Sequence, residues 1–318
     1  MTFTKPILLT LICSGVFAAY SQGIEWRRTR AAFASPVRAL CINSQGDILA
    51  GTEGGMYRST NGGEDWSEIH LNLTWPSVVS IVAVAGDVLL AGVNTDVGTV
   101  IRSTDAGETW NTDSLLKPTD RIRSLTIVRG GGILVGTDAA ILRSSHAGEG
   151  WEHLKTGLDS AYFFSSLLVA AGGCVFAGTC DFIDGGGYGV YRSTDNGTSW
   201  SRASHGLTSL EVQSLAVDSS GIVFAGVRRA LLQSGDNGKN WSTLETGTTD
   251  THMYPVLCSR NGQVFVGTSI GVLVSDNRRM TWVLQKPGGT AVESIAAEEH
   301  GGVFLGTYGG EVYRGHLR

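Results

Sequence analysis

Short apolar stretches, separated by turns that contain glycine, recur along the whole chain. In each repeat a first apolar stretch, such as residues 37–42, is followed by a second one that ends in glycine, such as Leu49-Ala50-Gly51. A third stretch leads into a polar hairpin, and a fourth begins at a tryptophan. The stretches alternate only weakly between apolar and polar positions, which favours strands covered on both faces by neighbouring sheets. The pattern predicts an all-β fold of stacked four-stranded sheets.

The repeat tryptophans set the period of this pattern. They are Trp26, Trp66, Trp110, Trp151, Trp200, Trp241 and Trp282, at spacings of 40, 44, 41, 49, 41 and 41 residues. A period of roughly 40–45 residues is the size of one propeller blade. The last unit, residues 292–318, lacks a strand with tryptophan, and the isolated segment 24–28 supplies one. We therefore predict a seven-bladed β-propeller in which an N-terminal strand completes the last blade and protects the sheet edges.

The polar hairpin has the pattern Ser-x-Asp-x-Gly-x-x-Trp, as in residues 193–200, and recurs at 59–66, 103–110, 144–151, 234–241 and 275–282. Its third position can bond the backbone two residues on, and its glycine permits positive φ. The tryptophan buries a large apolar surface. The third positions predicted to be structural are Asn61, Asp105, Asp195, Asp236 and Asn277. His146 replaces the acid in one copy and Arg279 replaces the glycine in another, so looser turns are expected there.

This motif resembles the Asp-box, or BNR repeat, of sialidases, the sortilin luminal domain, xyloglucan-hydrolysing propellers and photosystem II assembly-factor-like proteins. The resemblance implies a propeller whose boxes lie at the periphery and whose ligands meet the opposite face. Recurrence in every repeat favours a folding role for the box aspartates over ligand or calcium binding. The chain departs from sialidases, since it has no early Phe-Arg-Ile-Pro-type motif and no assignable Tyr–Glu nucleophile.

The N-terminus indicates export. Lys5, the apolar stretch 7–19 and the small residues around Ala19 and Ser21 predict a signal peptide over residues 1–21 and a mature propeller over 22–318. An uncleaved anchor is the alternative, although the apolar stretch is short for a membrane span. We expect a secreted or periplasmic protein with no membrane span after signal removal.

Composition excludes several other classes of site. The net charge is −5 and the basic residues form no run, so nucleic-acid binding is not expected. Four cysteines would remain in the mature chain, and we expect all four to be buried thiols: Cys41, Cys174, Cys180 and Cys258. No zinc-ligand spacing occurs, and neither a metal nor a cofactor is predicted.

Candidate binding residues lie in the loops that join the second strand to the third and the fourth strand to the next blade. Trp75 has no counterpart in other repeats, and the longest loop carries Asp181, Asp184 and Tyr188. Trp75 and Tyr188 are candidates for stacking on a sugar ring. Equivalent positions of the first strands form one further column: Arg38, Val79, Arg123, Ser165, Gln213, Pro255 and Glu293. Arg38, Arg123 and Glu293 either face a ligand or satisfy one another in a wet channel.

A second set of arginines recurs at one place in the third strands, and we expect interblade hydrogen bonds from it: Arg58, Arg102, Arg143, Arg192 and Arg314. Regular repeats, short loops and the lack of a recognisable catalytic set favour an exported, non-enzymatic platform that binds protein or glycan. The alternative is a glycoside hydrolase that uses Asp181 and Asp184, whose carboxyl groups would have to lie about 5–10 Å apart. Hydrolysis of a glycoside panel that is lost in Asp184→Asn but kept in Asp236→Asn would select the alternative.

Overall fold

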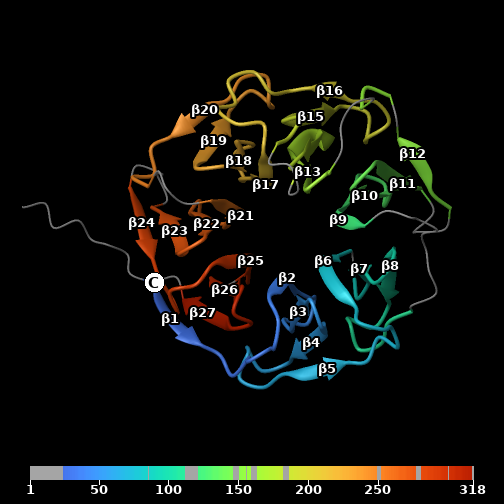
Figure 1. Ribbon diagram of the computed structural model, residues 1–318, viewed down its shortest axis with the longest axis vertical. Coiled ribbons are helices and arrows are strands. Elements are labelled where there is room, and N and C mark those ends of the chain that lie inside the picture. The colour runs from blue at the N-terminus through green and yellow to red at the C-terminus, as the bar shows by residue number, and fades with distance from the viewer. Residues whose placement is uncertain are drawn as a thin grey trace, which may run out of the picture.

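The strands form a closed ring. The computed structural model describes residues 24–84, 86–111, 121–145, 150–154, 156–158, 163–181, 186–248, 252–276, 281–299 and 301–316. Their strands make seven sheets arranged as blades around a central axis (Figure 1). The innermost strands of neighbouring blades contact one another in a complete cycle, β2, β6, β9, β13, β17, β21, β25 and back to β2. The predicted all-β, seven-bladed propeller is confirmed.

Each blade is an antiparallel meander that runs from the axis outward. Within the described residues six blades have four strands and blade 2 has three, and the short 3-10 turn η1 (Ala171–Gly173) lies in blade 4. Blades 1 to 3 consist of β2 (Val37–Ile42), β3 (Ile48–Thr52), β4 (Gly55–Ser59) and β5 (Ser67–Ile69); β6 (Ser77–Ala83), β7 (Leu89–Asn94) and β8 (Gly98–Ser103); and β9 (Ile122–Ile127), β10 (Ile133–Thr137), β11 (Ile141–Ser144) and β12 (Glu152–Leu154).

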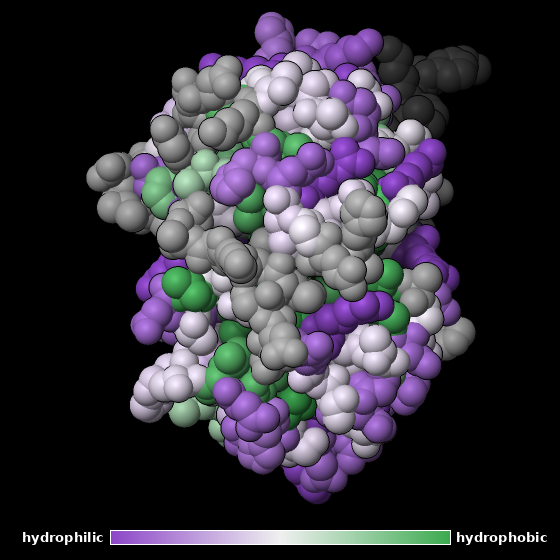
Figure 2. All heavy atoms as spheres, turned by 90° about the vertical axis from the view of Figure 1, so that its right-hand side faces the viewer, coloured by the Kyte–Doolittle hydropathy of each residue, from purple (hydrophilic) through white to green (hydrophobic). Residues whose placement is uncertain are grey.

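Blades 4 to 7 follow the same plan. They consist of β13 (Ser166–Val169), β14 (Val175–Gly178), β15 (Val190–Ser193) and β16 (Ser201–Arg202); β17 (Val212–Val217), β18 (Val223–Val227), β19 (Ala230–Ser234) and β20 (Ser242–Leu244); β21 (Met253–Cys258), β22 (Val264–Thr268), β23 (Gly271–Ser275) and β24 (Trp282–Gln285); and β25 (Val292–Ala297), β26 (Gly302–Thr307), β27 (Val312–His316) and β1 (Glu25–Arg28). Middle strands such as β3, β10 and β22 are buried throughout, whereas outer strands such as β12 and β16 are largely exposed. Figure 2 looks at the rim from the right-hand side of Figure 1 and shows polar residues interleaved with smaller apolar areas.

The ring is closed by its N-terminal strand, as predicted. β1 pairs antiparallel with β27, which places Trp26 opposite Gly315 and Arg28 opposite Tyr313. The Trp26 indole N–H donates to the Gln285 side-chain oxygen of blade 6. Ile24 is buried in the same apolar cluster as Tyr313. Segments from the two ends of the described chain therefore build one blade.

Close approach between blades explains the glycine at the end of each second strand. In six blades this glycine lies opposite the small residue of the first strand, as Gly136 does opposite Ser124. A Cβ atom on Gly136 would lie 2.7 Å from the Phe164 carbonyl oxygen of the next blade. The Ser124 hydroxyl donates to that same oxygen at 2.8 Å. These glycines therefore allow neighbouring blades to approach closely.

The polar hairpins form one recurrent turn. In blade 4 the Ser193 hydroxyl accepts from the Gly197 N–H at 2.8 Å and donates to Asp195 Oδ1 at 2.7 Å. Asp195 Oδ1 also accepts from the Ser199 N–H at 2.9 Å. The acid thus bonds the backbone four residues on, whereas a bond two residues on was expected from the sequence. The turn is longer than expected because Asn196 and Gly197 both take positive φ. The same bonds recur around Asn61, Asp105 and Asp236.

The repeat tryptophans brace these turns. The indole N–H groups of Trp66, Trp110 and Trp200 donate to the carbonyl of the hairpin glycine, whereas Trp241 donates to the Ala203 carbonyl of the preceding blade connection. Trp200 and Trp241 are buried, while Trp66, Trp110, Trp151 and Trp282 are half-buried. His146, Asn277 and Arg279 lie outside the described residues.

Acid should weaken the protein through these hairpins. The Ser199 hydroxyl and backbone N–H that bond Asp195 hold the pKa of its carboxyl at about 2. Because this pKa is below that of an unfolded aspartate, about 3.9, the carboxylate stabilises the fold above about pH 4 and loses this effect as pH falls toward 2. Asp195→Asn keeps an acceptor, as Asn61 does, but cannot titrate. Urea unfolding should show the gap in unfolding free energy between wild type and Asp195→Asn shrinking from pH 5 to pH 2.

The matched control for this prediction is Glu152→Gln, at an exposed position of an outer strand. Its gap to wild type should stay constant over the same pH range. A gap for Asp195→Asn that is equally constant would contradict the role of the Asp195 charge.

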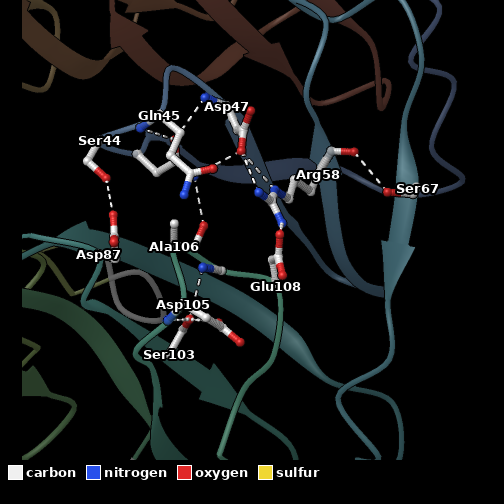
Figure 3. A network of polar contacts seen from close by, with 12 residues as sticks. Ser44, Gln45, Asp47, Arg58, Ser67, Asp87, Ser103, Asp105, Ala106 and Glu108 are labelled. Atoms are coloured by element: carbon white, nitrogen blue, oxygen red, sulfur yellow. Dashed lines mark hydrogen bonds and ion pairs between the residues drawn. The ribbon is translucent and has the colours of Figure 1, made fainter.

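Two of the repeated third-strand arginines, Arg58 and Arg143, connect neighbouring blades. Arg192 and Arg314 instead bond within their own blades, to Cys174 and to Glu298, which corrects the prediction at these positions. Arg58 binds Asp47 of its own blade at 2.6 Å and reaches Glu108 in the hairpin of blade 2 at 3.5 Å (Figure 3). Arg143 donates to Thr198 in the hairpin of blade 4 at 2.9 Å. The predicted interblade bonds are therefore present at these two positions.

All four described cysteines are free thiols; Cys41 and Cys180 are buried as expected, whereas Cys174 and Cys258 are half-buried.

Candidate functional site

The two faces of the ring differ. One face, the turn face, carries the turns between first and second strands and the polar hairpins. The other, the loop face, carries the turns between second and third strands and the connections from each blade to the next. The hairpins and the arginines that contact them contribute to folding on the turn face.

A β-bulge at the loop-face end of the first strands creates the column of candidate residues. In blade 1, Val37 pairs with Thr52 and Ala39 pairs with Gly51, so Arg38 is left between them. The same slip isolates Val79, Arg123, Gln213 and Glu293, and in blade 6 it spans Tyr254 and Pro255. Ser165 immediately precedes β13. A bulge re-aims the extra side chain, and all seven column residues are half-buried at this mouth of the ring.

Ion pairs satisfy both column arginines. Arg38 donates through Nη1 to Glu293 at 2.7 Å and through Nε to Glu53 at 2.9 Å. Arg123 pairs with Asp138. Burial raises the pKa of the Glu293 carboxyl, and the charge of Arg38 opposes that rise. Arg38 and Glu293 thus follow the alternative in which channel residues satisfy one another across the junction of blades 7 and 1.

A cavity of about 560 Å³ opens between blades 1 to 4 on the loop face. Trp75, Arg38 and Arg123 all line it, together with Glu53, Ser77, Asn94, Thr95, Arg121 and Ser165 among others. The side chain of Trp75 is 85% exposed, and its backbone takes a left-handed φ of 50°. The structure therefore brings together three of the residues nominated from sequence.

The remaining nominated residues lie elsewhere. Tyr188 packs against an apolar cluster of blades 3 and 4, beside Tyr191. Asp181 pairs through its backbone with Gly186 and does not line the cavity. Burial, together with the charges of Glu211 and Asp181, raises the pKa of the neighbouring Cys180 thiol to about 12, so this thiol stays protonated. Asp184 lies outside the described residues.

Sequence reasoning missed Glu53 and Asp138, the acids that neutralise Arg38 and Arg123. Each acid follows the Gly-Thr pair that ends its second strand, and each lies 15 residues after its arginine. An acid occurs at this place in the two repeats whose column residue is arginine. Comparison of column and turn positions repeat by repeat would have found both ion pairs.

Comparison with protein families agrees with this architecture. Residues 13–208, more than half of the chain, match the model of the DUF6242 beta propeller domain. The chain belongs to the DUF6242 β-propeller family. A search of curated proteins found no match.

Solved propellers resemble this DUF6242 chain in fold. YCF48 from Cyanidioschyzon merolae is 14% identical with a TM-score of 0.71, over 92% of this chain and 98% of that one. Virginiamycin B lyase from Staphylococcus aureus is 9% identical with a TM-score of 0.78, over 93% of this chain and 100% of that one. The extracellular domain of BT4673 from B. thetaiotaomicron, described as a one component system, is 17% identical with a TM-score of 0.75 over 92% of this chain. The DUF6242 chain spans only 40% of the length of that domain.

At these sequence identities the comparisons establish a shared fold, and the function has to be argued from the residues of the site. Among the described residues of the DUF6242 chain, no helix has the length and apolar character needed to cross a membrane.

Proposed function

We propose that this propeller is a binding or assembly platform that docks a partner protein on its loop face. The observation that carries the proposal is where the exposed apolar side chains lie. Of the six large hydrophobic side chains that are exposed among the described residues, five belong to the loop face: Trp75, Val97, Leu210, Ile270 and Tyr308. Val283, on the outer strand β24, is the exception.

Isolated exposed apolar residues are common on protein surfaces. Their placement on one face, beside a polar cavity, favours that face as the interaction surface. Trp75 and Tyr308 are 85% and 58% exposed, and aromatic residues are enriched among the anchors of protein interfaces. Because these side chains are spread around the ring, they suit a partner that covers the face more than a single sugar ring.

The structural neighbours support the same interpretation. YCF48 has been solved bound to a D1 peptide, and that structure is 16% identical to this chain with a TM-score of 0.73 over 93% of it and 95% of YCF48. The BT4673 neighbour is an extracellular domain. We include in the proposal a signal peptide over residues 1–21, a mature propeller over 22–318 in the periplasm or outside the cell, and assignment of the polar hairpins to the Asp-box class.

Site-specific photo-cross-linking in the native host tests the proposal. A photoreactive residue in place of Tyr308 should give adducts with a partner protein, because Tyr308 is exposed on the loop face. The same probe in place of Ser219, exposed in a turn of the opposite face, is the matched control and should give none. Equal adducts from both positions, or adducts from Ser219 alone, would refute docking on the loop face.

A glycan array on the mature protein completes the test. Glycan binding together with no protein adduct from Tyr308 would indicate that the partner is a glycan and not a protein.

A further inference from the structure

We propose that the mouth cavity binds an acidic segment of the partner protein, with a carboxylate at Arg121 and a planar side chain against Trp75. This inference rests on the proposed function and names the chemistry of the partner. It follows from the charges of the cavity, from its size and from the backbone of Trp75.

Among the described residues, one cation of the cavity wall has no acidic partner. Three arginines and one carboxylate, that of Glu53, line it. Arg38 forms ion pairs with Glu53 and Glu293, and Arg123 forms one with Asp138. Arg121 is exposed and pairs with no carboxylate within the described part of the chain. A guanidinium binds a carboxylate through charge-assisted hydrogen bonds, so a carboxylate is the group that completes this wall.

The size of the cavity selects a short segment. Its volume of about 560 Å³ falls within the range of small-ligand pockets, roughly 300–1,000 Å³. A loop tip of a partner protein fits such a space, and the exposed apolar residues around it would then contact the body of the partner. The cavity and the surrounding loop face thus serve one interface.

The backbone of Trp75 supports a binding role. A left-handed φ is rare for a bulky residue, and the proline that follows at position 76 disfavours helical conformations further. Folding gains little from this arrangement, since the indole is 85% exposed. Residues held in such conformations cluster at ligand-binding sites. The indole lines the same cavity as Arg121, so one ligand segment can contact both.

Fluorescence titration with blocked pentapeptides tests the inference. The peptide probe carries one tyrosine and two central glutamates, and its control carries glutamines in their place. We expect the acidic peptide to bind the full-length protein more tightly, with an affinity that falls as salt is raised. Arg121→Glu should weaken binding about tenfold or more. Arg129→Glu, the same charge change on an exposed turn of the opposite face, should leave it unchanged.

Trp75→Ala should weaken binding of the acidic peptide about two- to tenfold. Trp75→Phe should weaken it much less, as expected for stacking. Equal binding of both peptides, no binding at millimolar concentration, or an unchanged affinity of Arg121→Glu would overturn the inference. Binding of a uronic-acid oligosaccharide in preference to the acidic peptide would overturn the peptide assignment. Each of these outcomes leaves the cross-linking result at Tyr308 intact, so failure here is separable from failure of the proposed function.

Discussion

Replacing Gly136 by alanine is expected to lower the free energy of unfolding by about 3 kcal/mol. The added Cβ would lie 2.7 Å from the Phe164 carbonyl oxygen and 2.6 Å from the Ser124 hydroxyl, closer than such atoms can approach. Blades 3 and 4 would have to separate, and the hydrogen bond from Ser124 to Phe164 would lengthen. Urea unfolding followed by tryptophan fluorescence measures the change.

The control for this prediction is Gly235→Ala. A Cβ on Gly235 meets no atom within 4 Å, and its backbone needs no positive φ. Threonine occupies the equivalent hairpin position at Thr104 and Thr194, so this variant should unfold like wild type. If both alanine variants were equally stable, the explanation of the second-strand glycines by interblade contact would be wrong.

Removal of the closing strand is expected to cost more than about 4 kcal/mol, since loss of a packed tryptophan alone costs about 3–5 kcal/mol. A chain that begins at residue 30 lacks β1 and exposes the outer edge of β27. It also loses the burial of Ile24 and the Trp26 bond to blade 6. Unpaired strand edges promote association, so this chain should also elute as larger species in size-exclusion chromatography.

A chain that begins at residue 23 retains β1 and is the matched control. It should unfold at the same urea concentration as the full chain and elute as the same species. If the two truncated chains had equal stability, β1 would be dispensable and the ring would be held by its other interfaces.

Repetition made the architecture predictable from sequence. Seven tryptophans at a regular period gave the number of blades, and the isolated Trp26 segment gave the closing strand. The second-strand glycines could be interpreted because the same residue recurs where every blade meets the next. Each of these inferences used a signal repeated several times along the chain.

Features that occur once were harder to predict. The bulge that isolates Arg38 depends on pairing between strands and leaves no local mark in the sequence. Tyr188 was nominated for surface stacking, and the structure places it half-buried against the apolar cluster of blades 3 and 4, because a tyrosine beside a glycine-rich loop has no preferred side until the loop is placed. The partners of Arg38 come from blade 7 and from a turn 15 residues away, so its neutralisation became evident only in three dimensions.

The first-strand bulges separate two kinds of position within one strand. Residues on either side, such as Val37 and Ala39, are fixed by the ladder, and Val37 also packs against Gly306 of blade 7. The bulged residue between them has no ladder partner, and in the five blades with a single bulged residue it is arginine, valine, arginine, glutamine or glutamate. Evolution or an engineer can therefore vary the residue at these bulges, and so alter what the ring recognises, provided that an arginine is exchanged together with the acids that neutralise it.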